Sequence, residues 1–178
     1  ADYLGVEPLK EAAAGALVER LAPSNALAAW TLADDLSLPS LAEAAKETAL
    51  RGFQALGESL LEAPLAQVEA LVADERLTAQ SEDAVFSAVA RVAEKQRPKE
   101  AALLAVLRHL RFPLMTREFL EQTVQPWPML DTKAGQKLLF DAMTASCFGT
   151  ARPPRVGFEK GNDGEEEEEE GEEEGSEA

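Results

Sequence analysis

The chain has 178 residues, enough for one ordinary domain, with a net charge of −16, one cysteine and one histidine. The charge is uneven, because residues 159–178 hold twelve acidic residues and one lysine, a net of −11, and the other 158 residues carry −5. A mildly acidic body with scattered lysines and arginines lacks the basic patch that nucleic-acid binding requires, so we expect no nucleic-acid partner.

The cysteine and the apolar runs narrow the class of protein further. A single cysteine, Cys147, excludes an internal disulfide framework and favours a reducing compartment, so we expect the cytoplasm or the nucleus. No apolar run approaches the roughly 18 residues that a membrane span needs, and we expect no membrane partner. The first methionine is Met115, which suggests an excised piece of a longer protein.

Apolar residues recur every three or four positions along most of the first 150 residues, which is the period of an amphipathic helix. The first such stripe comprises Val6, Leu9, Ala13, Leu17 and Leu21. The pattern predicts about eight short helices, near residues 6–21, 25–36, 41–53, 65–72, 85–93, 103–110, 119–124 and 138–143. The short links between them favour antiparallel pairs.

Helix start and stop signals agree with this pattern. Ser81 before Glu82 and Asp83 predicts a capped helix start, and Thr116 predicts another. Ser40 with Glu43 matches a capping box. Prolines at positions 98, 113, 126 and 128 predict stops or turns.

The predicted fold is therefore all-α, because no stretch alternates over enough residues to indicate a strand. Since no repeat of 34–47 residues is evident, we expect an irregular array of helical hairpins. From about Gly157 onward the dense glutamates repel one another, and we expect a disordered acidic tail.

Few residues could carry catalytic or metal chemistry. His109 is the only histidine, so a His-containing triad or metal site is not expected, and we interpret it as a surface residue near a helix end. We interpret Cys147 as a structural thiol. Asp34 and Asp35 point about 100° apart on a helix and do not converge, so we interpret them as solvated. No cofactor motif is present, and we expect no cofactor and no enzyme activity.

Two tryptophans remain as candidate interface anchors. Trp30 and Trp127 are each more consistent with core packing than with a binding role, by about two to one. Trp127 lies between two prolines, where a rigid loop could present the ring outward as easily as inward.

The segments, taken in order, resemble the BACK domain of BTB–Kelch proteins with the helical link that precedes it. Residues 21–27 (LAPSNAL) look like the family's L-x-P-S-N-A-L signature. Three later stretches are similar to family motifs, namely residues 74–89 (DERLTAQSEDAVFSAV), 111–115 (RFPLM) with 118–124, and 138–143 (LLFDAM). The start of the chain, residues 1–9, is similar to the stretch that ends the BTB fold.

The resemblance implies three regions. Residues 1–22 would be the end of a BTB fold and the first linking helix, residues 23–150 the BACK-like helical domain, and residues 151–178 a linker with the acidic tail. The signature residues Pro23, Ser24, Asn25, Ala26 and Leu27 would mark a structural seam between helices.

The resemblance also implies a role as a non-catalytic scaffold in a substrate adaptor for a cullin–RING ubiquitin ligase. A class-three cullin would bind the helices around residues 6–36 together with a BTB domain absent from this chain, and a homodimer would form only through that absent domain. An alternative from the residues themselves is an acidic-tailed binding protein or chaperone for basic proteins such as histones, because the −11 segment would attract cations. A helical enzyme is the weakest alternative.

Overall fold

The structure, a computed structural model, describes residues 6–147, with side chains described for residues 9–145. The described part contains nine α-helices and no strand, which confirms the prediction of an all-α fold with about eight helices. They are α1 (Val6–Val18), α2 (Pro23–Asp35), α3 (Pro39–Arg51), α4 (Glu58–Glu62), α5 (Leu65–Ala73), α6 (Glu82–Gln96), α7 (Glu100–Leu107), α8 (Arg117–Phe119) and α9 (Lys133–Cys147). Short 3-10 segments are η1 (Phe53–Leu56), η2 (Phe112–Leu114) and η4 (Pro128–Leu130), and η3 (Leu120–Val124) is π-helical.

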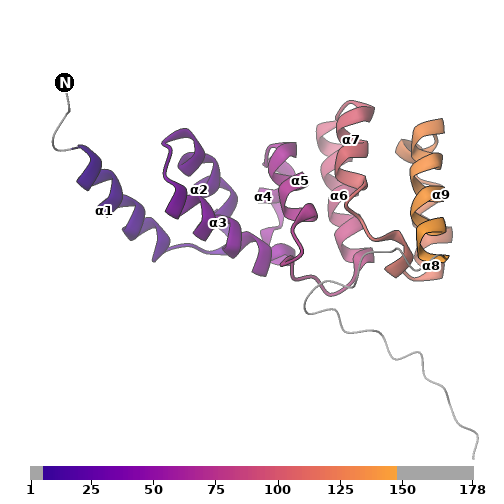
Figure 1. The fold of residues 1–178 in the computed structure, drawn as a ribbon, viewed down its shortest axis with the longest axis horizontal. Coiled ribbons are helices and arrows are strands. Elements are labelled where there is room, and N and C mark those ends of the chain that lie inside the picture. Colours follow the sequence, from indigo (N-terminus) through magenta and orange to yellow (C-terminus); the bar gives the residue numbers. More distant parts are fainter. Residues whose placement is uncertain (1–5, 148–178) are drawn as a thin grey trace, which may run out of the picture.

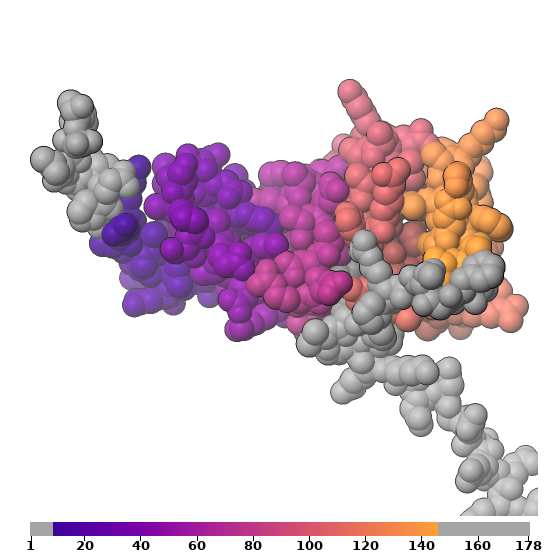
Figure 2. All heavy atoms as spheres, viewed as in Figure 1, coloured from indigo at the N-terminus to yellow at the C-terminus, as the bar shows by residue number. Residues whose placement is uncertain are grey.

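The helices follow one another along the long axis of the molecule, with α1 at one end and α9 at the other (Figure 1). Helix α1 packs on α3, α2 packs on α3 and α4, and further along α4 packs on α6, α5 on α7 and α7 on α9. The space-filling view shows an elongated body in which chain order and position coincide (Figure 2). Within residues 6–147, no helix is long and apolar enough to cross a membrane.

One continuous core runs from α2 to η4, and a small second cluster attaches α1. The predicted apolar face of α6 is buried throughout, since Val85, Phe86, Val89, Val92 and Ala93 are each at most 1% exposed. The second cluster consists of Ala14, Ala33 and Leu41, one residue from each of the first three helices. Helix α1 is therefore held to the array by a much smaller apolar contact than its neighbours.

Polar contacts join α6 to α4. Arg91 and Lys95 of α6 bind Glu58 and Glu62 of α4 at 3.2 and 3.4 Å, and each contact spans 33 residues. The Gln96 side chain donates to the carbonyl oxygens of Leu61 and Ala63, which closes the C-terminal end of α4. Helix lengths still differ widely between pairs, so the array is irregular as predicted.

Two predicted caps are confirmed and one is wrong. The Ser81 hydroxyl oxygen accepts from the Ala84 N–H at 3.1 Å, and that of Thr116 accepts from the Phe119 N–H at 3.3 Å. The capping box of Ser40 and Glu43 does not form, because α3 already begins at Pro39, with Leu38 before it. The fixed φ of proline suits a first helical position, and this places Ser40 inside the helix.

Two features of the structure differ from the prediction, and one further prediction concerns residues that the structure does not describe. Helix α4 has only five residues, too few for a periodic signal, and was not predicted. The apolar stripe of α1 is not a buried face, because Leu9 is 70% and Leu17 38% exposed. Ala14, one position away from the stripe, makes the contact instead, so α1 faces the array through small side chains. The disorder expected from about Gly157 lies outside the described residues.

Candidate interaction surface

The seam between α1 and α2 is held by Asn25. Its side-chain oxygen accepts from the Ala22 N–H at 2.8 Å, and its side-chain nitrogen donates to the Arg20 carbonyl at 3.0 Å. Ala22 occupies the N-cap position and has no side-chain acceptor, so the amide of Asn25, three residues later, takes over part of the capping role. One side chain thus satisfies backbone groups on both sides of the turn.

Replacing Asn25 with alanine is expected to lower the free energy of unfolding by about 1 kcal/mol, because two backbone groups lose their partner. Chemical denaturation followed by circular dichroism measures this change. Ser24→Ala is the matched control, since Ser24 is exposed at the same seam, and it is expected to stay within about 0.5 kcal/mol of the parent. Equal effects of the two substitutions would contradict the capping role of Asn25.

The other signature residues lie at the same seam with different surroundings. Pro23 is the first residue of α2, and it packs so closely on Gly52 that a Cβ at Gly52 would lie 2.5 Å from the proline Cγ. Ala26 and Leu27 are buried at 0% and 2% exposure in the main core. The signature therefore joins the end of α1, the start of α2 and the end of α3. Gly52 was not predicted as part of it, because a lone glycine after a helix gives no indication of its distant neighbour.

Helices α1 and α2 expose large apolar side chains. The exposed set at this end of the molecule comprises Leu9, Leu17 and Val18 on α1, Leu32 on α2 and Leu36 directly after α2. Leu9 and Leu17 are two helical turns apart, and Leu32 and Leu36 are one turn apart, so each pair shares a helix face. Several large apolar side chains exposed at one end of a protein are candidates for contact with a partner. We call these five residues the N-terminal apolar surface.

A groove of about 400 Å³ lies beside this surface, between α1 and the turn from α2 to α3. Ala14, Leu38 and Leu41 contribute apolar side chains and Glu11 a carboxylate. Gly15 also lines the α1 wall, and the space beside it is open, since a Cβ there would meet nothing within 4 Å. The groove could accept an apolar side chain with a donor group next to it.

The turn at the edge of the groove has an unusual backbone. Ser37 has a φ of 56°, the left-handed conformation that favours glycine. The Leu38 N–H donates to the Ala33 carbonyl and the Ser37 N–H to the Asp34 carbonyl, which is the Schellman pattern of a helix end. The sequence did not reveal this groove, since neither Gly15 nor Ser37 belongs to a recognisable motif.

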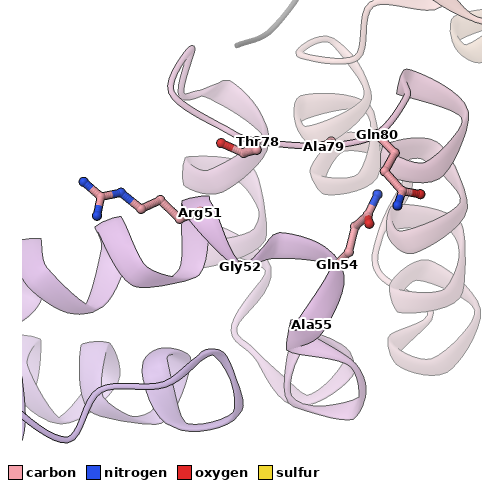
Figure 3. A pocket seen from close by; sticks show the side chains of 7 residues that line it. All are labelled: Arg51, Gly52, Gln54, Ala55, Thr78, Ala79 and Gln80. Carbon is pink, nitrogen blue, oxygen red and sulfur yellow. The ribbon is translucent and has the colours of Figure 1, made fainter. Parts of the chain in front are cut away.

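A second, smaller pocket of about 240 Å³ lies between the end of α3, η1 and the loop before α6 (Figure 3). Gln54 and Gln80 extend toward one side of it, and Arg51 points away from them, where it pairs with Glu47. Gly52, Ala55 and Ala79 contribute no reactive group. Carboxamides donate and accept hydrogen bonds but do not titrate, and the other polar side chains of the lining are the Thr78 hydroxyl and the Arg51 guanidinium.

An ion-pair cluster fixes the loop after α5 against α3. Arg76 donates to both carboxylate oxygens of Asp74, at 3.0 and 2.9 Å, and also binds Glu43 at 3.0 Å. Lys46 lies 2.8 Å from Asp74, whose side chain is 12% exposed. The guanidinium of Arg76, and to a smaller extent Lys46, hold the pKa of Asp74 well below its usual range.

The stability of the protein should therefore fall in acid through Asp74. Because the pKa of Asp74 is lowered on folding, its contribution is present above the unfolded value of about 4 and is lost as the pH falls below it. Asp74→Asn is expected to be less stable than the parent at pH 7, and the difference should shrink below about pH 4. Denaturation curves from pH 7 to pH 2 measure this. A difference that is independent of pH would contradict the account.

The residues considered for chemistry do not converge on a site. Asp34 and Asp35 are exposed near the end of α2, and His109 is half-buried after α7 with its Nε2 3.6 Å from Glu69 Oε1. Cys147 ends α9, and its side chain lies outside the described ones. Among the described residues no group of three His, Cys, Asp or Glu side chains could hold a metal ion.

The two tryptophans pack against the main core, as interpreted from the sequence. Trp127 is 7% exposed, and its ring centroid lies 5.3 Å from that of Phe86. Trp30 is only partly buried against the same cluster. The exposed anchors at the N-terminal end are therefore leucines and a valine rather than aromatic residues.

Comparison with known proteins identifies the family. Residues 26–125, more than half of the chain, match the BACK family, described as BTB And C-terminal Kelch. The chain belongs to the BACK family. It is 29% identical to Kelch-like protein 7 of Rattus norvegicus over 133 residues, which is 73% of this chain and 23% of that protein. It is 32% identical to Kelch-like protein 35 of Mus musculus over 165 residues, or 87% and 29%, and 33% identical to Kelch-like protein 3 of Homo sapiens over 112 residues, or 61% and 19%.

The chain thus spans about a quarter of the length of these Kelch-like relatives. The resemblance to a BACK domain of the Kelch-like family is confirmed. The family match lies within residues 23–150, the predicted extent of the BACK-like domain, and begins inside the predicted signature, at Ala26. The boundaries at residues 22 and 150 stay predictions.

Proposed function

We propose that this BACK domain is a non-catalytic spacer in a substrate adaptor for a cullin–RING ubiquitin ligase. The end formed by α1 and α2 would bind a class-three cullin, and the far end would lead toward the region that holds the substrate. The observation that carries this proposal is the N-terminal apolar surface, with its groove, at one end of an elongated array. The cytoplasm or the nucleus is the compartment proposed for this role.

The shape of the molecule supports a spacer. Successive helical pairs contact their neighbours along the axis, so the distance between the two ends is set by packing rather than by a flexible linker (Figure 1). The salt bridges and side-chain caps between α4 and α6 tie one pair to the next. Such an array can hold two binding modules at a fixed separation.

The N-terminal apolar surface is composed of side chains like those at the buried centre of a protein–protein interface. Its leucines and valine are apolar side chains between 38% and 70% exposed, and burial of each against a partner would be favourable by about 1–2 kcal/mol. Helix α1 is attached to the array by the three-residue cluster around Ala14, which leaves most of its circumference available to a partner.

The proposal is tested by calorimetric titration of this chain with the N-terminal domain of a class-three cullin. The double substitution Leu9→Ser with Leu17→Ser is expected to weaken binding at least about tenfold, because two interface leucines are lost. Phe140→Ser is the matched control, since Phe140 is 70% exposed like Leu9 but lies on α9 at the opposite end. Equal affinities of the parent and the double variant, or no binding by the parent, would contradict the proposal.

A second candidate function rests on the acidic segment, and it concerns a different class of partner. Residues 159–178 carry a net charge of −11, which would attract basic proteins such as histones over about 8–10 Å at physiological ionic strength. Deletion of residues 159–178 is expected to abolish salt-dependent histone binding and to leave cullin binding unchanged. Histone binding that survives the deletion, or that the parent lacks, would reject this second function.

A further inference from the structure

The last helix of the array carries an exposed apolar face of its own. On α9, Leu138, Leu139 and Ala142 pack against the main core, whereas Phe140 is 70% and Met143 38% exposed. Phe140 and Met143 are three residues apart and therefore share one helix face. The last helix of a helical array needs a polar outer face to remain soluble by itself. An exposed phenylalanine on that face therefore indicates that another segment covers it.

The sequence directly after α9 contains suitable apolar residues. Residues 148–158, which lie outside the described residues, include Phe148, Val156 and Phe158, whereas residues 159–178 contain no large apolar side chain. Gly149 and the prolines at positions 153 and 154 oppose continuation of α9. A chain that leaves the helix at this point can change direction.

The reach of this segment is sufficient. Phe140 precedes the end of α9 at Cys147 by seven residues, or about 10 Å of helix at 1.5 Å per residue. An extended chain covers about 3.3 Å per residue, so the stretch from residue 148 to Val156 can span more than 20 Å. Val156 and Phe158 can therefore return to the level of Phe140 with length to spare.

We propose that residues 148–158 of this chain dock on the outer face of α9 and cover Phe140 and Met143 with Phe148, Val156 and Phe158. The docked segment completes the far end of the array. The inference is independent of cullin binding at the other end.

Limited trypsin digestion of the whole chain tests this docking. Trypsin can cut after Arg155, inside the proposed segment, and after Lys160, beyond it. Phe140→Ser is expected to accelerate cleavage after Arg155 about tenfold, because the docked segment loses its main contact, and to leave cleavage after Lys160 unchanged. Leu9→Ser, at an equally exposed position on α1, is the control and should change neither rate.

Other occupants of the face give different results. Equal cleavage after Arg155 in the parent and in Phe140→Ser would overturn the proposal. A parent dimer in size-exclusion chromatography that Phe140→Ser converts to monomer, with cleavage after Arg155 unchanged at low concentration, would show that a second copy covers the face and would also overturn it. Phe140 is exposed, so an unchanged circular dichroism spectrum is expected to confirm that the variant folds.

Discussion

Replacing Phe86 with alanine is expected to lower the free energy of unfolding by about 3–5 kcal/mol. The Phe86 ring is 1% exposed and makes edge-to-face contacts with three aromatic rings. The centroid distances are 6.4 Å to Phe112, 5.7 Å to Phe119 and 5.3 Å to Trp127. These partners come from η2, α8 and the turn before η4, so one side chain joins α6 to the segments between α7 and α9.

Urea denaturation followed by circular dichroism and by tryptophan fluorescence measures this loss. Trp127 touches Phe86, so its emission should shift in the folded variant as well. Leu9→Ala is the control, because Leu9 is 70% exposed and its truncation should stay within about 0.5 kcal/mol of the parent. If Phe86→Ala lowered the free energy of unfolding by less than about 1 kcal/mol, the Phe86 ring would not have the role in core packing described here.

Replacing Glu82 with glutamine is expected to lower the free energy of unfolding by a similar amount, about 3–5 kcal/mol, because it removes the negative charge of a buried ion pair. Glu82 is 1% and Arg111 4% exposed, and Arg111 Nε lies 4.0 Å from Glu82 Oε1. Glu82 is the first residue of α6, and Arg111 directly precedes η2. The pair therefore connects the start of α6 to the segment after α7 within the core.

A double substitution separates the charge from the packing. Glu82→Leu with Arg111→Leu removes both charges, and it is expected to recover most of the stability that Glu82→Gln loses. The exposed pair of Arg117 and Glu121 supplies the control, since Glu121→Gln should leave the unfolding midpoint unchanged. If Glu82→Gln were as mild as Glu121→Gln, or if the double variant were the least stable of all, the pair would have no such role.

The fold class and most helix positions could be predicted because the apolar period and the capping residues act locally. The faces around Val85 and Leu103 are buried as their spacing indicates, and Ser81 and Thr116 cap the helices that follow them. Pro39 shows where such rules compete, since a proline fixed the start of α3 and displaced the capping box predicted at Ser40. Helix α4 was not predicted, because five residues are too few for a helical period of apolar residues to be recognised.

The candidate surface could be predicted only in part, because it depends on contacts between distant residues. The stripe of Leu9 and Leu17 was visible in the sequence, but periodicity alone cannot show whether a stripe faces a core or a partner. The groove lies between α1 and the turn that contains the left-handed Ser37, and no local pattern pairs these two segments. Asn25 was expected at the seam between helices, but its bond back to Arg20 depends on the conformation of the whole turn.

The pairing of helices could likewise not be predicted from the sequence. The salt bridge from Glu58 to Arg91 and that from Glu62 to Lys95 share an offset of 33 residues, although the helices that carry them differ in length by ten residues. Charged surface residues vary with little cost, so such an offset leaves no repeating apolar pattern to detect. Both contacts join α4 to α6, so the shared offset reflects one register between these two helices.

Hydrogen–deuterium exchange of the chain, with and without the N-terminal domain of a class-three cullin, tests most directly whether the α1–α2 end of this BACK domain binds that cullin. We predict slower exchange in the backbone amides of residues 6–41, which contain α1, α2 and the groove, and unchanged exchange in α9. Unchanged exchange across residues 6–41, or protection confined to α6–α9, would contradict cullin binding at this end.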